Sequence, residues 1–378
     1  MNLVLFFTRN VSLEEWVARG LFDREKLLYE EHLRRGECAR VVWLTYGRED
    51  ARTAARLKAE GCLHPDIEVL PPPRLLAGGL RRFLYTFLMP LIHRDALRDA
   101  DVLKTNQIDG CWSALIAGRL FGKPVVVRSG YTPSLLAEAE ATPARRKWLY
   151  RFAESLACRF ADALIVSAEP DRQYVERAHP AARARLHVVP NYVDTRRFQP
   201  GGGRREPEDL VFVGRLTGVK NLLPLVRAVG KTGNPLVLYG EGELRDAVRR
   251  TANTSGASVR LMGAVPNFQL PGILNRYRYF VLPSAHEGMP KALIEAMACG
   301  LVCIGADIPG IRAIIRDGEN GYLADGADPD ALAAAIRRAT RAAWEPVSAA
   351  AVETARARFS LQGAADRHHA VLQKALGR

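Results

Sequence analysis

The chain has 378 residues, which suggests two or three domains, because a typical domain holds about 100–200 residues. Hydrophobic residues make up 48% and charged residues 25%, a balance that excludes a disordered or fibrous protein. The net charge of +13 divides into +7 for residues 1–200 and +6 for residues 201–378, so no basic tail stands out. A basic chain can meet nucleic acid, anionic lipid or phosphorylated small molecules, and charge alone does not choose among them.

The N-terminal residues and the cysteines indicate a cytoplasmic protein. The segment MNLVLFF is apolar, but it has no basic start and no small-residue cleavage site, so it predicts a first strand. Six scattered cysteines do not form the disulfide framework of a secreted protein. The longest apolar run, residues 83–92, is about half the length of a membrane-spanning helix.

Short apolar runs alternate with segments of helical periodicity along the whole chain, which is typical of βαβ units and parallel sheets. In the first half the predicted strands are Leu3–Phe7, Val41–Thr45, Val125–Arg128 and Leu164–Ser167. In the second half they are Leu210–Val213, Leu236–Tyr239, Val259–Met262, Tyr279–Leu282 and Val302–Gly305. The rhythm predicts an α/β protein with two doubly wound sheets.

A run of glycines and charges at residues 201–207 predicts a linker between the two sheets. We therefore expect an N-terminal domain over residues 1–200, joined by a C-terminal helix over 361–378, and a second domain over 201–360. The Ala-rich residues 331–351 predict surface helices with a stop at Pro346, and the tail predicts an exposed His368-His369 pair. Ligands of such sheets bind beyond the carboxyl ends of the strands.

The most informative stretch is FVLPSAHEGMPKALIEAMACG, residues 280–300. A strand ends near Pro283, Pro290 can occupy the first position of a helix, and Gly300 can end that helix. The backbone amides near Gly288 and Met289 would then lie at the positive end of the helix, which favours anions such as phosphate.

Two glutamates flank this helix. Glu287 precedes it and Glu295 lies inside it, and eight helical residues would place them about 80° apart, so that both can face one ligand. Surface solvation is the commoner role of such a pair. Glu295 is surrounded by apolar residues, however, where an unsatisfied carboxylate is costly, so a ligand is the better explanation. His286 can either touch that ligand or pack the loop.

Two further loops follow predicted strands. In LVFVGRLTGVKN the strand ends at Gly214, and Arg215 and Lys220 follow it, two cations that can clamp a diphosphate. In LVLYGEGELRDAV the turn Gly240-Glu241-Gly242 joins a strand to a helix, but no third glycine completes a dinucleotide fingerprint. Each loop alone is also compatible with an ordinary solvated turn.

Together these segments resemble glycosyltransferase family 4, the retaining nucleotide-sugar transferases of the GT-B fold, in which two Rossmann-like domains face each other across a cleft. The resemblance is dense over residues 190–330 and thin over residues 1–190. It rests on VGRLTGVKN, GEGELR, GIRAIIRDGENGYL, VVPNYVDTRRFQP and residues 263–300.

The resemblance implies a role for each motif residue. The diphosphate would be bound by Arg215 and Lys220 beside Gly214, and the ribose by Glu295. The base would lie near Gly240, Glu241 and Val265, and the transferred sugar near Glu287, Gly288, Met289 and Pro290. The implied catalytic residues are Glu287, Arg215 and Lys220. No metal or cofactor is implied, because the nucleotide-sugar is itself a substrate.

The acceptor side departs from the family pattern. The loop after the first strand reads TRNVSLEEW where many members have a glycine pair, and the region where members often have a histidine contains Arg128 and Ser129. We expect these two residues and Asn106 on the acceptor side.

The expected activity is retaining transfer of a sugar from a UDP- or GDP-linked donor to a glycan or lipid-linked acceptor. The commonest setting of the family is bacterial cell-surface polysaccharide or lipopolysaccharide biosynthesis, in the cytoplasm or peripherally at the inner face of the membrane. The alternatives are a protein that binds a nucleotide-sugar without catalysis, or a related GT-B enzyme such as an epimerase.

Other patterns compete less well. Asp99 and Asp101 form a DxD pair of the kind that binds a divalent ion, but their context favours a helix end entering a strand. Cys299 and Cys303 have no partner ligands for a metal, so two buried thiols are expected. Residues 81–94 and 145–152 set arginines beside aromatic residues, which suits either ordinary amphipathic helices or an anionic membrane surface, whereas no nucleic-acid-binding module is evident.

Overall fold

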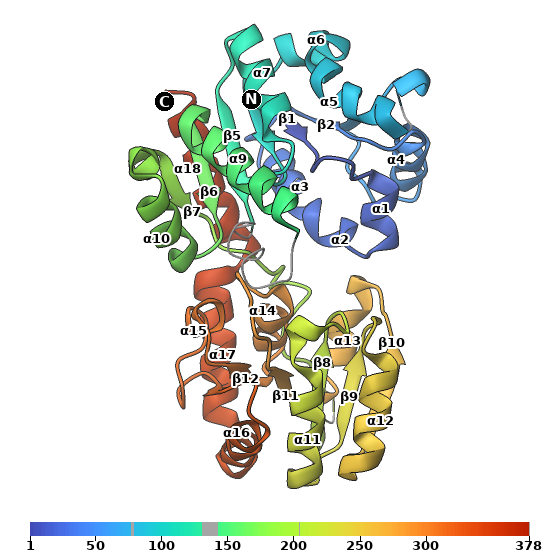
Figure 1. Cartoon of the computed structure of the whole chain (residues 1–378), viewed down its shortest axis with the longest axis vertical. Coiled ribbons are helices and arrows are strands. Elements are labelled where there is room, and N and C mark those ends of the chain that lie inside the picture. Colours follow the sequence, from blue (N-terminus) through green and yellow to red (C-terminus); the bar gives the residue numbers. More distant parts are fainter. Residues whose placement is uncertain (77–78, 131–142, 204, 378) are drawn as a thin grey trace. The chain divides into compact units, whose positions relative to one another are not determined.

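The computed structural model describes residues 1–76, 79–130, 143–203 and 205–377 (Figure 1). The chain forms two compact units. The N-terminal unit comprises Met1–Val189 with Ala364–Arg378, and the C-terminal unit comprises Pro190–Gly363. The division lies before the glycine-rich linker. Residues 190–200, expected in the first domain, pack instead within the C-terminal unit, where the backbone of Val193 forms a bridge with Ser360.

A seven-stranded parallel sheet forms the centre of the N-terminal unit. The predicted strand pattern is confirmed, although three short strands are added to it. Its strands, in spatial order, are β3 (Ile67–Leu70), β2 (Arg40–Leu44), β1 (Asn2–Phe6), β4 (Val102–Thr105), β5 (Val125–Ser129), β6 (Ala163–Val166) and β7 (Leu186–Val188).

Helices connect these strands and pack along the sheet. In the core, the rings of Phe7 and Trp16 stack with their centroids 4.0 Å apart, and Trp43 contacts Phe7 at a tilt and Trp16 edge-on. The helices are α1 (Leu13–Ala18), α2 (Phe22–Glu25), α3 (Leu27–Arg34), α4 (Asp50–Ala59), α5 (Gly79–Ile92), α6 (Arg94–Arg98), α7 (Cys111–Phe121), α9 (Ala144–Phe160), α10 (Glu169–Ala178) and α18 (Leu361–Ala375), with short 3-10 turns η1 (Arg74–Leu76) and η2 (Pro180–Arg185).

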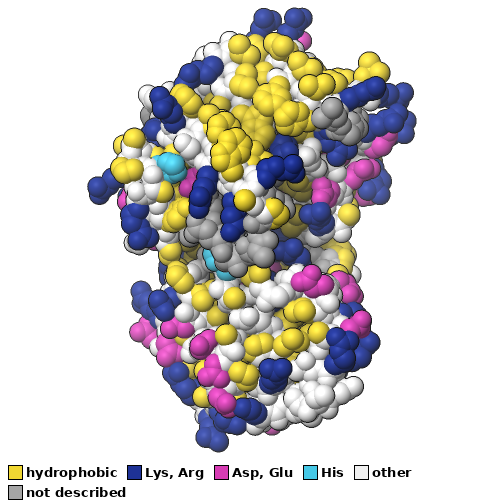
Figure 2. All heavy atoms as spheres, in the orientation of Figure 1, with side chains coloured by type: hydrophobic (Ala, Val, Ile, Leu, Met, Phe, Trp, Pro, Cys, Tyr) yellow, Lys and Arg dark blue, Asp and Glu magenta, His cyan; other side chains and the backbone are white. Residues whose placement is uncertain are grey.

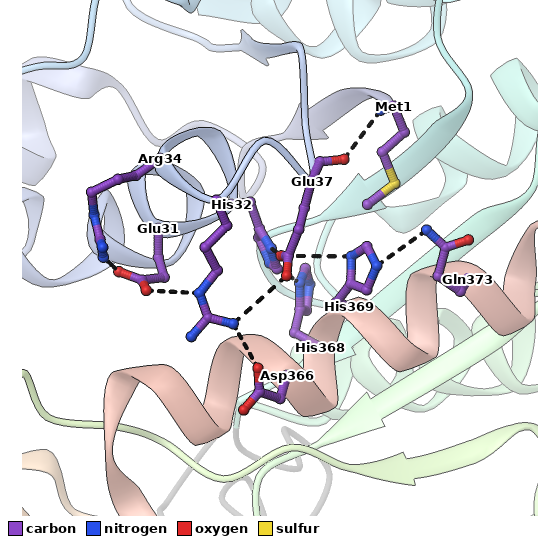
Figure 3. A network of polar contacts seen from close by, with 10 residues as sticks. Met1, Glu31, His32, Arg34, Glu37, Asp366, His368, His369 and Gln373 are labelled. Carbon is purple, nitrogen blue, oxygen red and sulfur yellow. Dashed lines mark hydrogen bonds and ion pairs between the residues drawn. The ribbon is translucent and has the colours of Figure 1, made fainter.

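The last helix, α18, contributes side chains to the core of the N-terminal unit, where Leu372 is fully buried. Figure 3 shows His368 and Asp366 of α18 beside His32 of α3. The Nδ1 atom of His368 lies 2.7 Å from Nε2 of His32, and Arg35, the residue after α3, donates to Asp366 at 2.6 Å. The expectation that His368 is exposed was wrong. It lies on the buried face of α18, and burial holds its pKa well below the ordinary value.

A six-stranded parallel sheet forms the centre of the C-terminal unit. Its strands, in spatial order, are β10 (Val259–Gly263), β9 (Leu236–Tyr239), β8 (Glu206–Val213), β11 (Tyr277–Leu282), β12 (Val302–Ala306) and β13 (Tyr322–Ala324). The prediction of two doubly wound parallel sheets is confirmed. The end of the predicted linker, Glu206 and Pro207, instead begins β8.

The helices of this unit follow its strands in alternation. They are α11 (Leu222–Thr232), α12 (Arg245–Ser255), α13 (Leu270–Leu274), α14 (Lys291–Ala298), α15 (Pro309–Arg312), α16 (Pro329–Arg341) and α17 (Trp344–Phe359), with 3-10 turns η3 (Gly218–Lys220) and η4 (Asn267–Gln269). Pro346 does not stop a helix as expected. It lies in the first turn of α17, where a proline removes no intrahelical hydrogen bond. In the part of the chain that is described, no helix is both long and apolar enough to cross a membrane.

Candidate functional site

The loop after β8 contains the first pair of candidate residues. Arg215 is exposed and forms no ion pair with any described side chain. The turn η3 follows, and Asn221 then takes a left-handed conformation with φ of 48°, which reverses the chain before α11 begins. Lys220, at the end of η3, is mostly buried, with 18% of its side chain exposed. The loop therefore holds one cation firmly and leaves the other accessible.

The loop after β9 packs directly on the loop after β8. A Cβ atom at Gly240 would lie 1.8 Å from the carbonyl oxygen of Gly214, so only glycine permits this approach. The amide of Leu216 donates to the carbonyl of Glu241 at 2.9 Å, and the amide of Gly240 donates to the carbonyl of Gly263 at 2.8 Å. The carboxylate of Glu241 is paired with Arg245 at 2.9 Å. The loops after β8, β9 and β10 thus form one continuous backbone surface.

The loop after β11 joins the same surface because β8 and β11 are neighbours in the sheet. The amide of Ala285 donates to the carbonyl of Val219 at 2.8 Å, and the side chain of Asn221 donates to the carbonyl of Pro283 at 3.0 Å. These bonds bring Lys220 into an ion pair with Glu287. Two candidate residues that lie far apart in the sequence therefore meet.

Helix α14 begins at Lys291, with Pro290 as its N-cap residue, and ends before Gly300, whose φ is 78°. Glu287 thus lies outside the helix, so the expected 80° separation from Glu295 does not apply. The backbone at Glu287 is fixed instead by packing, since a Cβ atom at Gly310 would lie 2.0 Å from its carbonyl oxygen.

Glu295 is buried, with 2% of its surface exposed, as its apolar surroundings predict. Its Oε1 atom accepts a hydrogen bond of 3.0 Å from Nδ2 of Asn267, which follows β10 in the loop that also contains Val265. This amide orients the carboxylate. Asn267 is not among the residues predicted from the sequence, because a single asparagine in a loop has no periodicity or spacing that marks it.

Asn191 is a second residue that the sequence analysis missed. Its Nδ2 atom donates to the carbonyl of Met289 at 2.7 Å, so it fixes the backbone just before α14. Met289 and Pro290 are buried, whereas Gly288 and His286 are partly exposed. The signal that points to Asn191 is its position in VVPNYVD, a segment that also carries the family resemblance.

The three acceptor-side candidates lie in the N-terminal unit, at the carboxyl ends of two neighbouring strands. Asn106 follows β4, and its Nδ2 atom donates to Oγ1 of Thr8 at 3.4 Å. Arg128 and Ser129 end β5, and a guanidinium nitrogen of Arg128 lies 3.8 Å from a carboxylate oxygen of Glu25. These residues therefore lie at the carboxyl edge of the N-terminal sheet, where β4 and β5 end.

The competing metal patterns have structural explanations. Asp99 is the C-cap residue of α6. The carboxylate of Asp101 accepts a hydrogen bond of 2.7 Å from the backbone amide of Asn2, the first residue of β1. Cys299 and Cys303 are buried free thiols, and burial raises the pKa of Cys299 to about 12.

Among the described residues, one trio has ligand atoms close enough for a metal ion: His32, Glu37 and His369. It lies in the N-terminal unit beside α18. His32 and Glu37 already satisfy each other there, through a contact of 2.5 Å between Nδ1 and Oε2.

Two family models match the chain. The model described as Glycosyltransferase Family 4 matches residues 28–197, and the model described as Glycosyl transferases group 1 matches residues 207–341.

Two curated relatives are similar over much of the chain. The UDP-Gal:alpha-D-GlcNAc-diphosphoundecaprenol alpha-1,3-galactosyltransferase of Escherichia coli is 29% identical over 260 residues, which cover 64% of this chain and 66% of the relative. The D-inositol 3-phosphate glycosyltransferase of Mycobacterium marinum is 30% identical over 238 residues, 57% of this chain and 51% of the relative. The chain thus spans about half to two thirds of the length of these relatives.

Solved structures share the fold over nearly the whole chain. Anabaena HepE in complex with UDP and glucose has a TM-score of 0.76 at 16% identity, and covers 98% of this chain and 99% of its own. Sucrose-phosphate synthase from Thermosynechococcus elongatus also has a TM-score of 0.76, at 18% identity, over 100% of this chain and 99% of its own.

Proposed function

Because this chain belongs to glycosyltransferase family 4 and has the GT-B fold, we propose that it transfers a sugar from a nucleoside-diphosphate sugar to a glycan or lipid-linked acceptor. The observation that carries the proposal is the convergence of four loops at the carboxyl ends of β8 to β11. That convergence joins Lys220 to Glu287, and Asn267, in the loop after β10, donates a hydrogen bond to the buried carboxylate of Glu295. Open parallel sheets bind nucleotides at this edge.

In this proposal the diphosphate of a UDP- or GDP-linked donor binds Arg215 and Lys220. The accessible guanidinium of Arg215 acts as a two-pronged hydrogen-bond donor, and Lys220 exchanges part of its interaction with Glu287 for a phosphate oxygen. The ribose hydroxyls bind Glu295, which Asn267 holds in position. The base lies against Gly240, Glu241 and Val265, and the sugar against Glu287 and residues 288–290.

We propose that catalysis consists mainly of stabilising the leaving group. As the bond between the anomeric carbon and the phosphate oxygen breaks, negative charge grows on the diphosphate, and preorganised cations at that point lower the barrier. The acceptor hydroxyl attacks the same face of the sugar, and its proton passes to the leaving phosphate. The product then retains the anomeric configuration, and the reaction needs no metal ion or cofactor. Inversion in the product would refute this step.

The acceptor in this proposal is linked to a lipid diphosphate. The support is that two of the similar enzymes are named for diphosphoundecaprenol and diphosphopolyprenol acceptors. We accordingly propose a role in bacterial surface polysaccharide or lipopolysaccharide assembly, with the protein in the cytoplasm at the inner face of the membrane.

Thermal unfolding with UDP, GDP, ADP, CMP, TDP and their sugar conjugates tests the donor site. A ligand at 100 times its dissociation constant stabilises the folded state by about 2.7 kcal/mol, which shifts the melting temperature measurably. We expect one nucleotide to shift the wild type and to shift Glu295→Ala and Arg215→Ala much less. If no nucleotide shifts the wild type, the proposed donor site is wrong.

A transfer assay then separates the proposal from its alternatives. We expect the bound nucleotide-sugar to be consumed in the presence of a polyprenyl-diphosphate glycan. Binding without turnover on any such acceptor would instead favour a non-catalytic binder. Conversion of the donor sugar without an acceptor would favour an epimerase.

A further inference from the structure

Large exposed hydrophobic side chains are concentrated on three helices of the N-terminal unit. Among the described residues, all but three of them lie on α5, α7 and α9. Figure 2 shows such side chains gathered on one face of the N-terminal unit, with Lys and Arg side chains around them. A typical soluble monomer scatters its exposed hydrophobic residues singly, so a contiguous patch of this kind indicates an interaction surface.

Helix α5 is amphipathic in a way that fits such a surface. Its inner face buries Tyr85, Thr86 and Met89 completely. Its outer face exposes five large side chains, which recur at helical spacing and are 40–60% exposed: Phe83, Leu84, Phe87, Leu88 and Leu91. The helix of 14 residues is about 21 Å long, too short to cross a hydrocarbon core of about 30 Å, so its outer face suits contact along a surface.

The neighbouring helices extend this face. Helix α7 packs against both α5 and α9, and it exposes Leu120. On α9, Trp148 and Phe152 stack with their ring centroids 5.5 Å apart, and Trp148 is 64% exposed. Arg119 of α7 lies 4.8 Å from the ring centroid of Phe160, so a cation also bridges α7 and α9 at the rim. We call the outer surface of α5, α7 and α9 the apolar-basic face.

The charges of the apolar-basic face select its partner. The three helices carry eight Lys or Arg residues and a single acidic residue, Glu154, which is buried. A second copy of the chain would bring the same cations against themselves, because a two-fold dimer joins identical surfaces. An anionic bilayer instead accepts the hydrophobic side chains and attracts the arginines, as interfacial amphipathic helices do.

We propose that the apolar-basic face binds the surface of an anionic lipid bilayer, with the outer side chains of α5 and the Trp148–Phe152 stack inserted below the headgroups. That this bilayer is the membrane that carries the acceptor rests on the proposed function. The contact itself rests only on the exposed side chains and charges of the N-terminal unit.

Sedimentation of the full chain with vesicles of equal parts phosphatidylglycerol and phosphatidylcholine tests the proposal. We expect binding to these vesicles, weakening as salt rises, and little binding to phosphatidylcholine alone. Leu84→Gln with Leu91→Gln removes two exposed hydrophobic anchors, and Arg81→Glu with Arg145→Glu reverses two exposed charges. Each pair should lower the partition coefficient at least about tenfold. Because these side chains are exposed, we expect unchanged thermal unfolding.

Control variants carry changes of the same kind in the C-terminal unit. Met262→Gln removes an exposed hydrophobic side chain from the C-terminal unit, and Arg249→Glu with Arg250→Glu reverses two exposed charges on α12. Neither should alter vesicle binding. Equal losses in controls and test variants would overturn the proposal, as would a wild type that does not bind anionic vesicles. A wild type that light scattering shows to be a dimer, and that Leu84→Gln with Leu91→Gln converts to a monomer, would overturn it too.

Nucleotide binding distinguishes this proposal from the proposed function. A chain that binds its nucleotide but no vesicle refutes the membrane contact and leaves the donor site standing. A chain that binds vesicles through these helices but no nucleotide refutes the donor site instead.

Discussion

The buried carboxylate of Glu295 gives the sharpest test of the donor site. Only 2% of the residue is exposed, so a hydrogen bond from a ribose hydroxyl to its carboxylate is little weakened by water. Hydrogen bonds to charged groups contribute about 1.5–3 kcal/mol. We therefore expect Glu295→Gln to weaken nucleoside-diphosphate binding by about 2 kcal/mol, which raises the Kd about 30-fold.

Isothermal titration with a matched pair of ligands isolates that bond. We expect the wild type to bind the ribonucleotide far more tightly than its 2′,3′-dideoxy analogue, and Glu295→Gln to bind the two almost equally. Glu243→Gln changes an exposed glutamate near the same loops and should behave like the wild type. If Glu295→Gln weakens both ligands by the same factor, the carboxylate does not bind the ribose and the reasoning fails.

Three further predictions concern the cation, the metal and the histidines. Lys220→Ala should lower kcat/KM for transfer by about 100-fold, because it removes a charge aimed at the leaving group, whereas Lys231→Ala, in an exposed ion pair, should leave it unchanged. Chelation with EDTA should not alter the transfer rate. Stability should fall as the pH drops below 6.5. Burial lowers the pKa values of His32 and His368 in the folded chain, so only the unfolded chain takes up protons there.

Each of these three has a result that would contradict it. Equal losses from Lys220→Ala and Lys231→Ala would point to a general charge effect. Activity lost to EDTA and restored by a divalent ion would establish a metal requirement. For the histidines, thermal melts across pH should show the free energy of unfolding changing by up to about 1.4 kcal/mol per pH unit for each group. His368→Gln should reduce that slope. An unchanged slope would mean that His368 does not stay neutral in the fold.

The strands that the sequence predicts are those with uninterrupted apolar runs, such as Leu236–Tyr239, which β9 matches in full. Strand β4 was missed because Lys104 interrupts its pattern. The structure buries this ammonium group, which donates to the hydroxyl of Tyr29 at 2.9 Å, and burial lowers its pKa to about 7. Such a partner comes from a distant segment, so local periodicity cannot reveal it.

The candidate site was predictable to the same extent. Motifs identified Lys220 and Glu287, and strand topology explains why the two loops that carry them meet. Asn267 and Asn191 act through single side-chain amides, and nothing in their neighbours' spacing predicts the atoms to which they donate. What is missed from the sequence is thus the set of groups that orient the predicted ones.

The return of α18 has a consequence for how the protein is made. The N-terminal unit includes residues after 363, and Leu372 belongs to its core together with strands from the first hundred residues. During synthesis from the amino end, this core stays incomplete while the whole C-terminal unit is being translated. The C-terminal unit is continuous in sequence and can close first. Loss of the last helical turns would therefore destabilise the part of the protein that was synthesised earliest.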